Sequence, residues 1–195
     1  MTLKISKLVF ATKNKNKLAE VMNILKDTGV SICGVEGEFD PEETGSTFKE
    51  NAFIKAYEAA KITQMPAFGD DSGLVVDALD GRPGVYSSRY AENDRKRIAK
   101  LIEELKDIPQ EKRTARFVCA MAVVNPDGKV LFSCEGTCEG LIIDSPKGVQ
   151  GFGYDPIFFI PEKNATMAEL TMDEKNTVSH RGKALKKIIE WLLSK

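Results

Sequence analysis

The apolar residues at the start of the chain predict a strand, a helix and a second strand. A short apolar run over residues 7–11 is typical of a buried strand. The helical spacing i, i+3, i+4, i+7 follows at Leu18, Val21, Met22 and Leu25. Gly29 then ends the helix, and residues 30–35 predict the second strand.

A polar, acidic loop over residues 36–45 leads into the next helix. The segment from Thr47 to Glu50 has the pattern of a capping box, and the alanine-rich sequence as far as Lys61 favours a helix. Residues 66–69 predict a further strand, which runs into Asp70-Asp71-Ser72-Gly73 and then into the apolar residues 74–76.

The second half of the chain predicts a helix, a hairpin and a final helix. Asp94 is suited to cap a helix whose apolar face carries Ile98, Leu101, Ile102 and Leu105. Residues 113–124 and 129–143 predict two long strands, joined by a tight turn over residues 125–128. The last helix buries Leu185, Ile188, Ile189 and Leu192.

Strands mixed with helices, some of them joined as a hairpin, predict an α/β fold with a mixed β-sheet and flanking helices. No repeat, low-complexity tract or linker interrupts the sequence, so we expect a single domain over residues 1–195. Two lobes around a central cleft would give such a domain a natural ligand site.

The charge balance narrows the classes of function. Lysine and arginine number 28 against 29 aspartates and glutamates, for a net charge of −1, so no global charge attracts nucleic acid or a membrane surface. No apolar run approaches the roughly 20 residues that span a bilayer, and no signal peptide is evident. We therefore expect a cytoplasmic protein that holds any anion through a local basic cluster.

The four cysteines favour neither a disulfide nor a zinc site. Cys134 and Cys138 lie on one predicted strand, which separates them by about 13 Å. That distance is too long for a disulfide or a shared metal ion. No pair has CxxC spacing, so we expect reduced, partly buried cysteines.

Residues 12–17 have the composition of an anion site between a strand and a helix. Unpaired N–H groups and the helix dipole at such a position attract phosphate, Thr12 and Asn14 can donate hydrogen bonds, and lysines add positive charge. The segment is Thr12, Lys13, Asn14, Lys15, Asn16 and Lys17. It lacks the glycines of a P-loop, and a capped helix with solvated lysines is the alternative.

Asp70 and Asp71 form the sharpest candidate for chemistry. Two adjacent carboxylates repel, so such a pair often binds a cation, and magnesium takes only one or two protein carboxylates when a polyphosphate supplies other oxygens. Glu42 and Glu43 of the acidic loop are plausible partners. The alternative is an exposed turn, because Asp-Asp-Ser-Gly is typical turn chemistry.

Two further segments carry candidate contacts for a nucleobase. Gly151-Phe152-Gly153-Tyr154-Asp155-Pro156 combines flexible backbone with an aromatic that can stack on a base and a carboxylate that can accept from ring N–H groups. An aromatic turn that closes the core is an equally good interpretation. Lys175 and the segment Ser179-His180-Arg181-Gly182 precede the last helix and offer donors to an anion or a base, although a lone histidine is more often structural.

In this order along the chain, the segments resemble the inosine triphosphate pyrophosphatases, also called XTP/dITP diphosphatases. The resemblance covers residues 8 to about 190. Its motifs are Ala11 to Lys17, Glu42-Glu43-Thr44-Gly45 with Phe48 and Glu50-Asn51-Ala52, Asp70 to Leu74, Gly81 to Gly84 with Tyr86 to Tyr90, Gly151 to Pro156, and Ser179 to Gly182.

The resemblance implies an elongated α/β fold with a central cleft, a homodimer and dependence on Mg²⁺. It implies hydrolysis of ITP, dITP and XTP between the α and β phosphates, giving a monophosphate and pyrophosphate. It places Asp71 as catalytic base and metal ligand, Glu43 as the other ligand and Asp70 in support. The implied substrate contacts are Thr12, Asn14, Lys17, Lys55 and Ser72, Phe152 stacking on the purine, Gly153, Tyr154 and Asp155 around it, and Lys175, His180 and Arg181 on the base.

One departure affects the first motif, where the family often has glycine at the positions of Lys13 and Asn16. Backbone contacts there are expected to differ. For the base, His180 and Arg181 can donate to a 6-keto oxygen, so adenine should be rejected, because its 6-amino group would leave those donors unpaired. The residues give no account of how guanine would be excluded.

Two other functions remain open from the residues alone. A nucleotide sensor without turnover would need the anion and base sites but not the carboxylates of Glu43, Asp70 and Asp71. A phosphatase, or a pyrophosphatase for other nucleotides such as modified pyrimidines, would need them. A nucleic-acid binder is disfavoured, because no basic stripe is evident.

Overall fold

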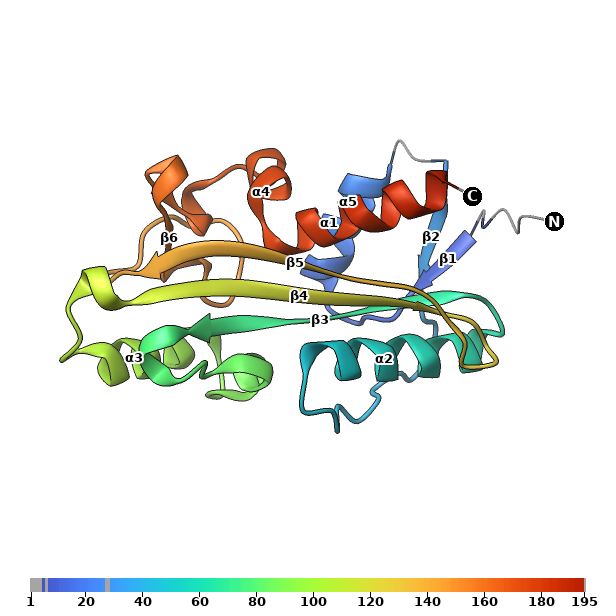
Figure 1. Ribbon diagram of the computed structural model, residues 1–195, viewed down its shortest axis with the longest axis horizontal. Helices are drawn as coiled ribbons and strands as arrows, with labels where there is room; N and C mark the ends of the chain where they lie inside the picture. The colour runs from blue at the N-terminus through green and yellow to red at the C-terminus, as the bar shows by residue number, and fades with distance from the viewer. Residues whose placement is uncertain (1–4, 6, 27–28, 195) are drawn as a thin grey trace. The chain divides into compact units, whose positions relative to one another are not determined.

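The computed structural model describes residues 5, 7–26 and 29–194. In these residues seven strands form one mixed sheet in the order β2-β1-β3-β4-β5-β6-β7. Strand β1 pairs in parallel with β2 and β3, whereas β6 pairs antiparallel with β5 and β7. Helices flank the sheet (Figure 1), which confirms the predicted mixed α/β fold.

The bounds of the elements are as follows. The strands are β1 Lys7–Phe10, β2 Ser31–Gly34, β3 Ala67–Val76, β4 Thr114–Val124, β5 Val130–Ile142, β6 Phe158–Ile160 and β7 Ala165–Thr166. The α-helices are α1 Lys15–Leu25, α2 Phe48–Thr63, α3 Asp94–Leu105, α4 Met172–Val178 and α5 His180–Leu193.

The chain divides into two compact units. The first unit comprises Met1–Asp71, Cys119–Gly136 and Arg181–Lys195, and the second comprises Ser72–Val118 and Thr137–His180. Each unit has its own hydrophobic core. No α-helix within the described ranges combines the length and the apolar character that a membrane span requires.

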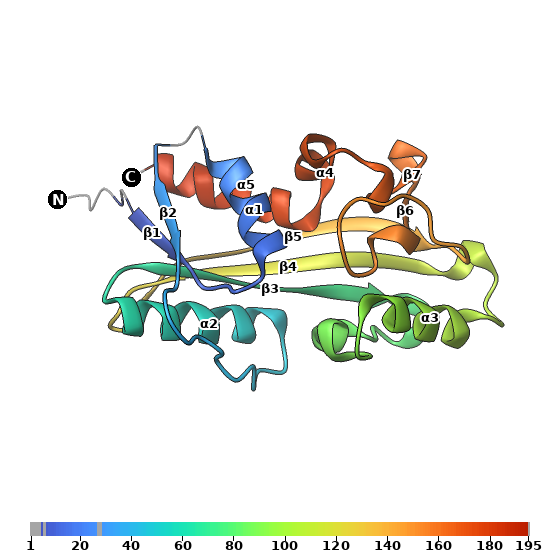
Figure 2. The ribbon, with the colours of Figure 1, turned by 180° about the vertical axis from the view of Figure 1, so that it is seen from behind.

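In the first unit, helices cover both faces of the sheet. Helices α1 and α5 lie on one face and α2 lies on the other (Figures 1 and 2). Successive side chains of β4 point alternately to the two faces of the sheet, as expected for a strand. Cys119, Met121 and Val123 pack on the side of α1 and α5, while Ala120, Ala122 and Val124 pack with the alanines of α2.

Helix α2 packs very closely against β3. The side chains of Ala52 and Ala56 are fully buried at this contact. A Cβ atom added at Gly69 of β3 would lie 2.5 Å from the Ala52 carbonyl oxygen and 2.7 Å from the Ala56 amide nitrogen. Glycine at this position therefore allows the helix backbone to approach the strand, and the approach brings Asn51 and Lys55 next to Asp71 of the same strand.

The second unit is built around α3 and the chain segments that follow β5. Leu101 and Leu105 of α3 are fully buried in a core with Leu74 of β3, Phe117 of β4 and Phe158 of β6. This core also includes Tyr154, which fixes one end of the glycine-rich segment over residues 148–153.

Several predicted elements are confirmed. Thr47 and Glu50 form the capping box of α2, and the hairpin turns at residues 125–128 with a 2.9 Å hydrogen bond from the Gly128 amide to the Asn125 carbonyl. All four cysteines are free thiols.

One alternative is excluded and two local predictions are wrong. The exposed-turn alternative for Asp70 to Gly73 is excluded, because β3 runs continuously through it and both aspartates are buried. Met22 of α1 is half exposed, and the buried polar residue on that helix is Glu20, which has an arginine partner. Asn93, not Asp94, caps α3, since its side chain accepts from the Lys96 amide at 3.0 Å.

The packing at Gly69 generates a stability prediction. Gly69→Ala should destabilise the protein by about 1–3 kcal/mol, because the new methyl group meets helix backbone that cannot move without disturbing α2. Urea unfolding at fixed pH measures the change. Gly34→Ala is the matched control, because a Cβ atom at that position of β2 meets nothing within 4 Å. Equal stability of the two variants would contradict this account of the helix–strand contact.

Candidate active site

Asp70 and Asp71 are adjacent in β3, but their carboxylates point to opposite faces of the sheet. Successive side chains of a strand alternate between faces, so the two charges are directed apart. Asp70 contacts Lys17 of α1 and Arg181 of α5, and Asp71 contacts Lys55 of α2. Each carboxylate therefore has its own set of partners.

Asp70 belongs to a buried network of ion pairs. Lys17 Nζ lies 3.0 Å from Asp70 Oδ2, and Arg181 Nε lies 3.3 Å from the same oxygen. The Arg181 guanidinium also donates to the Glu20 carboxylate. Burial alone would raise the pKa of Asp70, but Lys17 and Arg181 outweigh it and hold that pKa well below its usual value. Asp70 is thus ionised and ties α1 and α5 to β3.

Asp71 shares a lysine with the acidic loop. Lys55 Nζ lies 2.7 Å from Glu43 Oε1 and 3.4 Å from Asp71 Oδ1. Lys55 and Asn51 are one turn apart on α2, and Asn51 donates a 3.1 Å hydrogen bond from Nδ2 to Asp71 Oδ2. Two carboxylates thus converge on one cation.

The pKa values of Asp71 and Lys55 are both raised at this cluster, and in each case opposing effects contribute. Burial raises the pKa of Asp71 and the neighbouring Glu43 charge adds to the shift, although Lys55 and Asn51 oppose it. Burial would lower the pKa of Lys55, but Asp70, Asp71 and Glu43 together keep that pKa above its usual value. Asp71 is therefore the carboxylate in this pair that accepts a proton more readily than an ordinary aspartate.

The start of α2 anchors the loop that carries Glu43. Glu50 Oε2 accepts from the Ser46 amide at 2.7 Å and from the Thr47 amide at 3.0 Å. Asn51 Oδ1 accepts from the Gly45 amide at 2.8 Å. Glu43 lies in this anchored loop and contacts Lys55. Glu42, in contrast, is exposed and lines a cavity of about 490 Å³.

The predicted anion segment caps α1 with its own side chains. Asn14 Oδ1 accepts from the amides of Asn16 at 2.9 Å and Lys17 at 3.3 Å, and Thr12 Oγ1 accepts from the Asn14 amide at 3.1 Å. The capped-helix interpretation is therefore confirmed. Only Oδ1 of Asn14 takes part in the cap, so a phosphate would be bound through Nδ2. Lys13 and Lys15 are exposed. Phosphate binding by residues 12–17 stays a prediction.

The donor set fits a magnesium ion that depends on its substrate for further ligands. In residues 5, 7–26 and 29–194, no group of three or more histidine, cysteine or acidic side chains is arranged to hold a metal ion. Glu43 and Asp71 nevertheless already share one cation in the Lys55 ammonium group. Magnesium typically takes one or two protein carboxylates and fills its shell with water and phosphate oxygens, so this pair suits it.

In the second unit, the Asp155 carboxylate organises the glycine-rich segment. Asp155 Oδ2 accepts from the Phe152 amide at 2.9 Å and from Lys175 Nζ at 2.8 Å. A Cβ atom at Gly151 would lie 2.1 Å from this oxygen and 3.2 Å from Lys175 Nζ, and φ of Gly151 is +76°. Glycine is required here on both counts.

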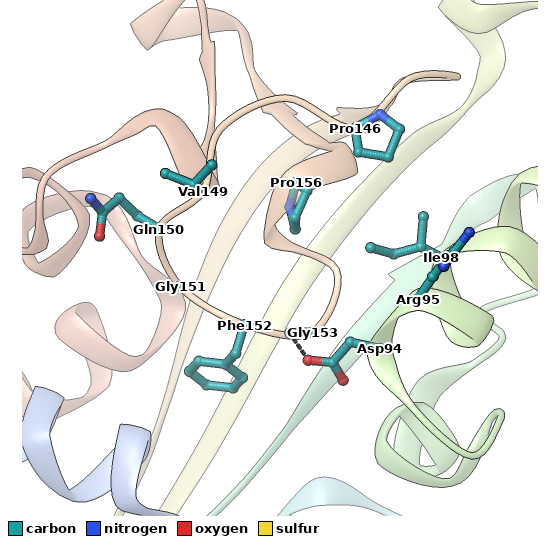
Figure 3. A pocket seen from close by; sticks show the side chains of 10 residues that line it. All are labelled: Asp94, Arg95, Ile98, Pro146, Val149, Gln150, Gly151, Phe152, Gly153 and Pro156. Atoms are coloured by element: carbon teal, nitrogen blue, oxygen red, sulfur yellow. Dashed lines mark hydrogen bonds between the residues drawn. The ribbon is translucent and has the colours of Figure 1, made fainter.

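The same segment presents an aromatic ring and a buried ammonium group together. Lys175 Nζ lies 4.9 Å from the centroid of the Phe152 ring. The Gly153 amide donates a 2.8 Å hydrogen bond to Asp94 of α3, and Figure 3 shows the Phe152 ring turned away from that helix. Phe152, Gly153 and Asp94 border a cavity of about 370 Å³, whose wall also includes Arg95 and Ile98. The Phe152 ring and Lys175 form a platform with a cationic donor beside it.

Tyr154 and His180 are both buried in the second unit. The Tyr154 hydroxyl donates to the Ser87 carbonyl at 3.0 Å, and burial raises the pKa of Tyr154. The His180 ring stacks on Phe117 with centroids 4.8 Å apart. Its neighbour Arg181 belongs to the first unit and is occupied with Asp70 and Glu20, so its role as a base contact stays a prediction.

The structure thus brings the predicted residues into two groups. The first unit collects Glu43, Lys55 and Asp71, with Lys17, Asp70 and Arg181 on the opposite face of β3. The second unit collects Phe152, Gly153, Asp155 and Lys175, and it also contains Ser72, Tyr154 and His180.

Three residues of these groups were not predicted: Glu20, Asn51 and Asp94. Each is polar and makes a hydrogen bond with a residue distant in the sequence, so no local pattern identifies its partner. For Asn51, a signal was present: it stands among the alanines on the inner side of a predicted helix.

Comparisons with known proteins find relatives that match nearly the whole chain. The sequence pattern of the Ham1 family matches residues 8–191. A protein from Halalkalibacterium halodurans named dITP/XTP pyrophosphatase is 52% identical over 190 residues, which cover 94% of this chain and 97% of that protein.

Two solved structures are also similar. A HAM1 protein from Coxiella burnetii has a TM-score of 0.88 and 44% identity, covering 97% of this chain and 99% of its own. The Staphylococcus aureus Ham1 protein has a TM-score of 0.86 and 39% identity, with 96% and 98% covered. The identity and the near-complete coverage show that this chain belongs to the Ham1 family.

Proposed function

We propose that this protein hydrolyses non-canonical purine nucleoside triphosphates, namely XTP, dITP and ITP, between the α and β phosphates to a nucleoside monophosphate and pyrophosphate. Such a reaction removes these nucleotides from the nucleotide pool. The names of the relatives supply the substrate class. The convergence of Glu43 and Asp71 on one cation is the observation that carries the reaction type.

Two carboxylates around one cation are what an enzyme acting on a polyphosphate needs, and what a sensor without turnover does not. A nucleotide sensor would bind the phosphates with cations alone, and buried Asp71 would then repel its ligand. Asp71 and Glu43 become useful when a divalent cation stands between them and the substrate. Mg²⁺ at that position would neutralise phosphate charge and polarise the bond to be broken.

Asp71 is the residue best suited to take a proton from the attacking water. Its raised pKa makes the ionised carboxylate a stronger base than that of an ordinary aspartate. Asn51 fixes the second oxygen of the carboxylate through a 3.1 Å hydrogen bond, so the first oxygen has a defined direction.

Lys55 is the residue best suited to neutralise the negative charge of the leaving pyrophosphate. Its pKa is raised, so it keeps its proton throughout the pH range of interest. Lys17, whose side chain is 15% exposed, contributes a second fixed charge from the opposite face of β3. Charge neutralisation and positioning account for most of the catalysis of phosphoryl transfer.

The second unit supplies contacts for a purine. The Phe152 ring would stack on the base, and the Lys175 ammonium group, one of whose donors is used by Asp155, would donate to a 6-keto oxygen. A nucleoside triphosphate carries both a base and a polyphosphate, which are the two chemistries that the two units present. Gly153, Tyr154, His180 and Arg181 belong to the same proposal as residues that shape or contact the base site.

The proposal also includes Mg²⁺ as the cofactor, a homodimer and a cytoplasmic location. Magnesium is supported by the two-carboxylate donor set. The homodimer rests on the family resemblance. The cytoplasmic location rests on the composition of the chain. Sedimentation analysis of the purified protein tests the dimer directly.

A substrate panel with Mg²⁺ tests the proposed function. The protein should release pyrophosphate, not phosphate, from XTP, dITP and ITP, and it should release little from ATP. Removing divalent cations with a chelator should abolish the release. Tight binding of XTP without any product would instead favour the sensor, and release of inorganic phosphate would favour a phosphatase.

In the same assay, Asp71→Asn should lower kcat by two or more decades, on the order of 3 kcal/mol in the activation free energy. The amide can neither accept the proton nor offer a negative charge to the metal ion. Asp127→Asn, on the exposed hairpin turn, is the matched control and should retain wild-type turnover. Near-wild-type turnover of Asp71→Asn would reject Asp71 as the base.

The raised pKa of Asp71 predicts how activity depends on pH and Mg²⁺ together. Protonated Asp71 neither accepts a proton nor binds a cation, so kcat/KM should fall as the pH drops through a pKa above the ordinary aspartate value of about 3.9. Because a metal ion binds only the ionised carboxylate, raising the Mg²⁺ concentration should move this acidic limb to lower pH. Profiles of kcat/KM at low and high Mg²⁺ measure the shift. An acidic limb that stays in place would show that Asp71 does not bind the metal.

The stacking contact predicts a separate effect on binding. Phe152→Leu keeps apolar bulk but removes the ring face, so KM for XTP should rise about tenfold or more while kcat changes less. Steady-state kinetics measure both. Val149→Ala, at a 95% exposed residue of the same segment, is the control and should leave KM unchanged. A large loss of kcat with constant KM would place Phe152 outside the base site.

A further inference from the structure

Asn51 is fully buried, and both ends of its side-chain amide are used. Its Oδ1 accepts a 2.8 Å hydrogen bond from the Gly45 amide, and its Nδ2 donates a 3.1 Å hydrogen bond to Asp71 Oδ2. The first partner lies in the acidic loop, two residues after Glu43, and the second is the buried carboxylate of β3. One side chain in the first turn of α2 therefore connects the two segments that carry the carboxylates.

The loop is shaped around this amide. A Cβ atom at Gly45 would lie 2.6 Å from Asn51 Oδ1, so only glycine lets the loop backbone come within hydrogen-bond distance of it. On the strand side, Gly69 lets α2 approach β3 closely. Gly45 thus lets the loop backbone approach Asn51, and Gly69 lets β3 approach the helix that carries Asn51.

The side-chain amide of Asn51 suits this position better than the functional group of any other side chain of its size. It offers an acceptor to a backbone N–H and a donor to a carboxylate at the same time. A carboxylate at the same place would repel Asp71, and an apolar side chain would leave both buried partners without a hydrogen bond.

We propose that Asn51 is a positioning residue, which fixes the acidic loop against Asp71 and thereby sets the separation of the Glu43 and Asp71 carboxylates for a divalent cation. This inference rests on the proposed function for its catalytic consequence. The link itself is a property of the first unit and can be tested without substrate.

Two substitutions separate the two hydrogen bonds. Asn51→Asp keeps an oxygen that accepts from the Gly45 amide but places a negative charge against Asp71. Asn51→Leu removes both hydrogen bonds but keeps the number and branching of the side-chain heavy atoms. Thr63→Val is the matched control, because it removes one side-chain hydrogen bond, of 2.7 Å to the Ala59 carbonyl, at the other end of the same helix.

The first measurement needs no substrate and no metal ion. Hydrogen exchange of the Gly45 amide, followed by NMR, should be slow in the wild type and in Asn51→Asp, and about fivefold or more faster in Asn51→Leu. Thr63→Val should exchange at the wild-type rate. Rapid exchange of the Gly45 amide in the wild type would overturn the link directly, even if neither Asn51 variant folds.

The second measurement is Mn²⁺ binding to the free protein, followed by electron paramagnetic resonance. Loss of the link should weaken binding by about 10- to 100-fold in Asn51→Leu, the usual effect of removing a residue that orients a metal ligand. Kinetics with XTP should show kcat reduced by a similar factor, with KM changed much less, because the base contacts lie elsewhere. Thr63→Val should match the wild type in both.

The outcomes distinguish this inference from the proposed function. If the wild type releases pyrophosphate and both Asn51 variants retain its kcat and Mn²⁺ affinity, Asn51 has no positioning role and the function stands. If the wild type releases none, the proposed function fails, and the Gly45 exchange and Mn²⁺ binding still decide the role of Asn51. Equal loss of kcat in Asn51→Leu and Thr63→Val would show general destabilisation and would overturn the inference.

Discussion

The alternation of side chains along β3 determines what the two adjacent carboxylates can do. In a turn or a helix, Asp70 and Asp71 would face the same solvent or the same partner, and their charges would compete. In a strand they face opposite sides of the sheet, so each has separate cations. Asp70 is only 1% exposed and forms ion pairs with Lys17 and Arg181, so its role is structural. Asp71 remains for the group that it forms with Lys55 and Glu43.

Lys55 gives that site its electrostatic balance. Without a cation, Glu43 and Asp71 would repel one another, and this repulsion would favour the protonated form of Asp71. The lysine offsets this repulsion. Under the proposed function, a substrate that brings phosphate charge and a divalent cation would let Lys55 turn from the carboxylates to the phosphates, so the total charge of the site stays balanced. Few side chains would have to move, which keeps the cost of reorganisation low.

The sequence predicted the elements better than the contacts among them. Apolar spacing identified the strands and helices, and the capping box at Thr47 was recognised because its signal lies within four residues. The Asp70 to Gly73 segment was ambiguous, since its composition is typical of a turn while its place in β3 is decided by pairing and by buried cations from distant helices. Asn51 and Glu20 escaped prediction for the same reason. Their partners are 20 and 161 residues away in the sequence, and the spacing of apolar residues within a helix or strand does not predict such distant contacts.

Base selection is the part of the function to which the structure adds most. The residues alone suggested His180 and Arg181 as donors to a 6-keto oxygen. In the folded chain the Arg181 guanidinium contacts Asp70 and Glu20, and the His180 ring stacks on Phe117. Lys175 is the donor that lies directly at the Phe152 ring, held there by Asp155. An ammonium group has donors and no acceptor, so it favours a keto oxygen over the 6-amino group of adenine.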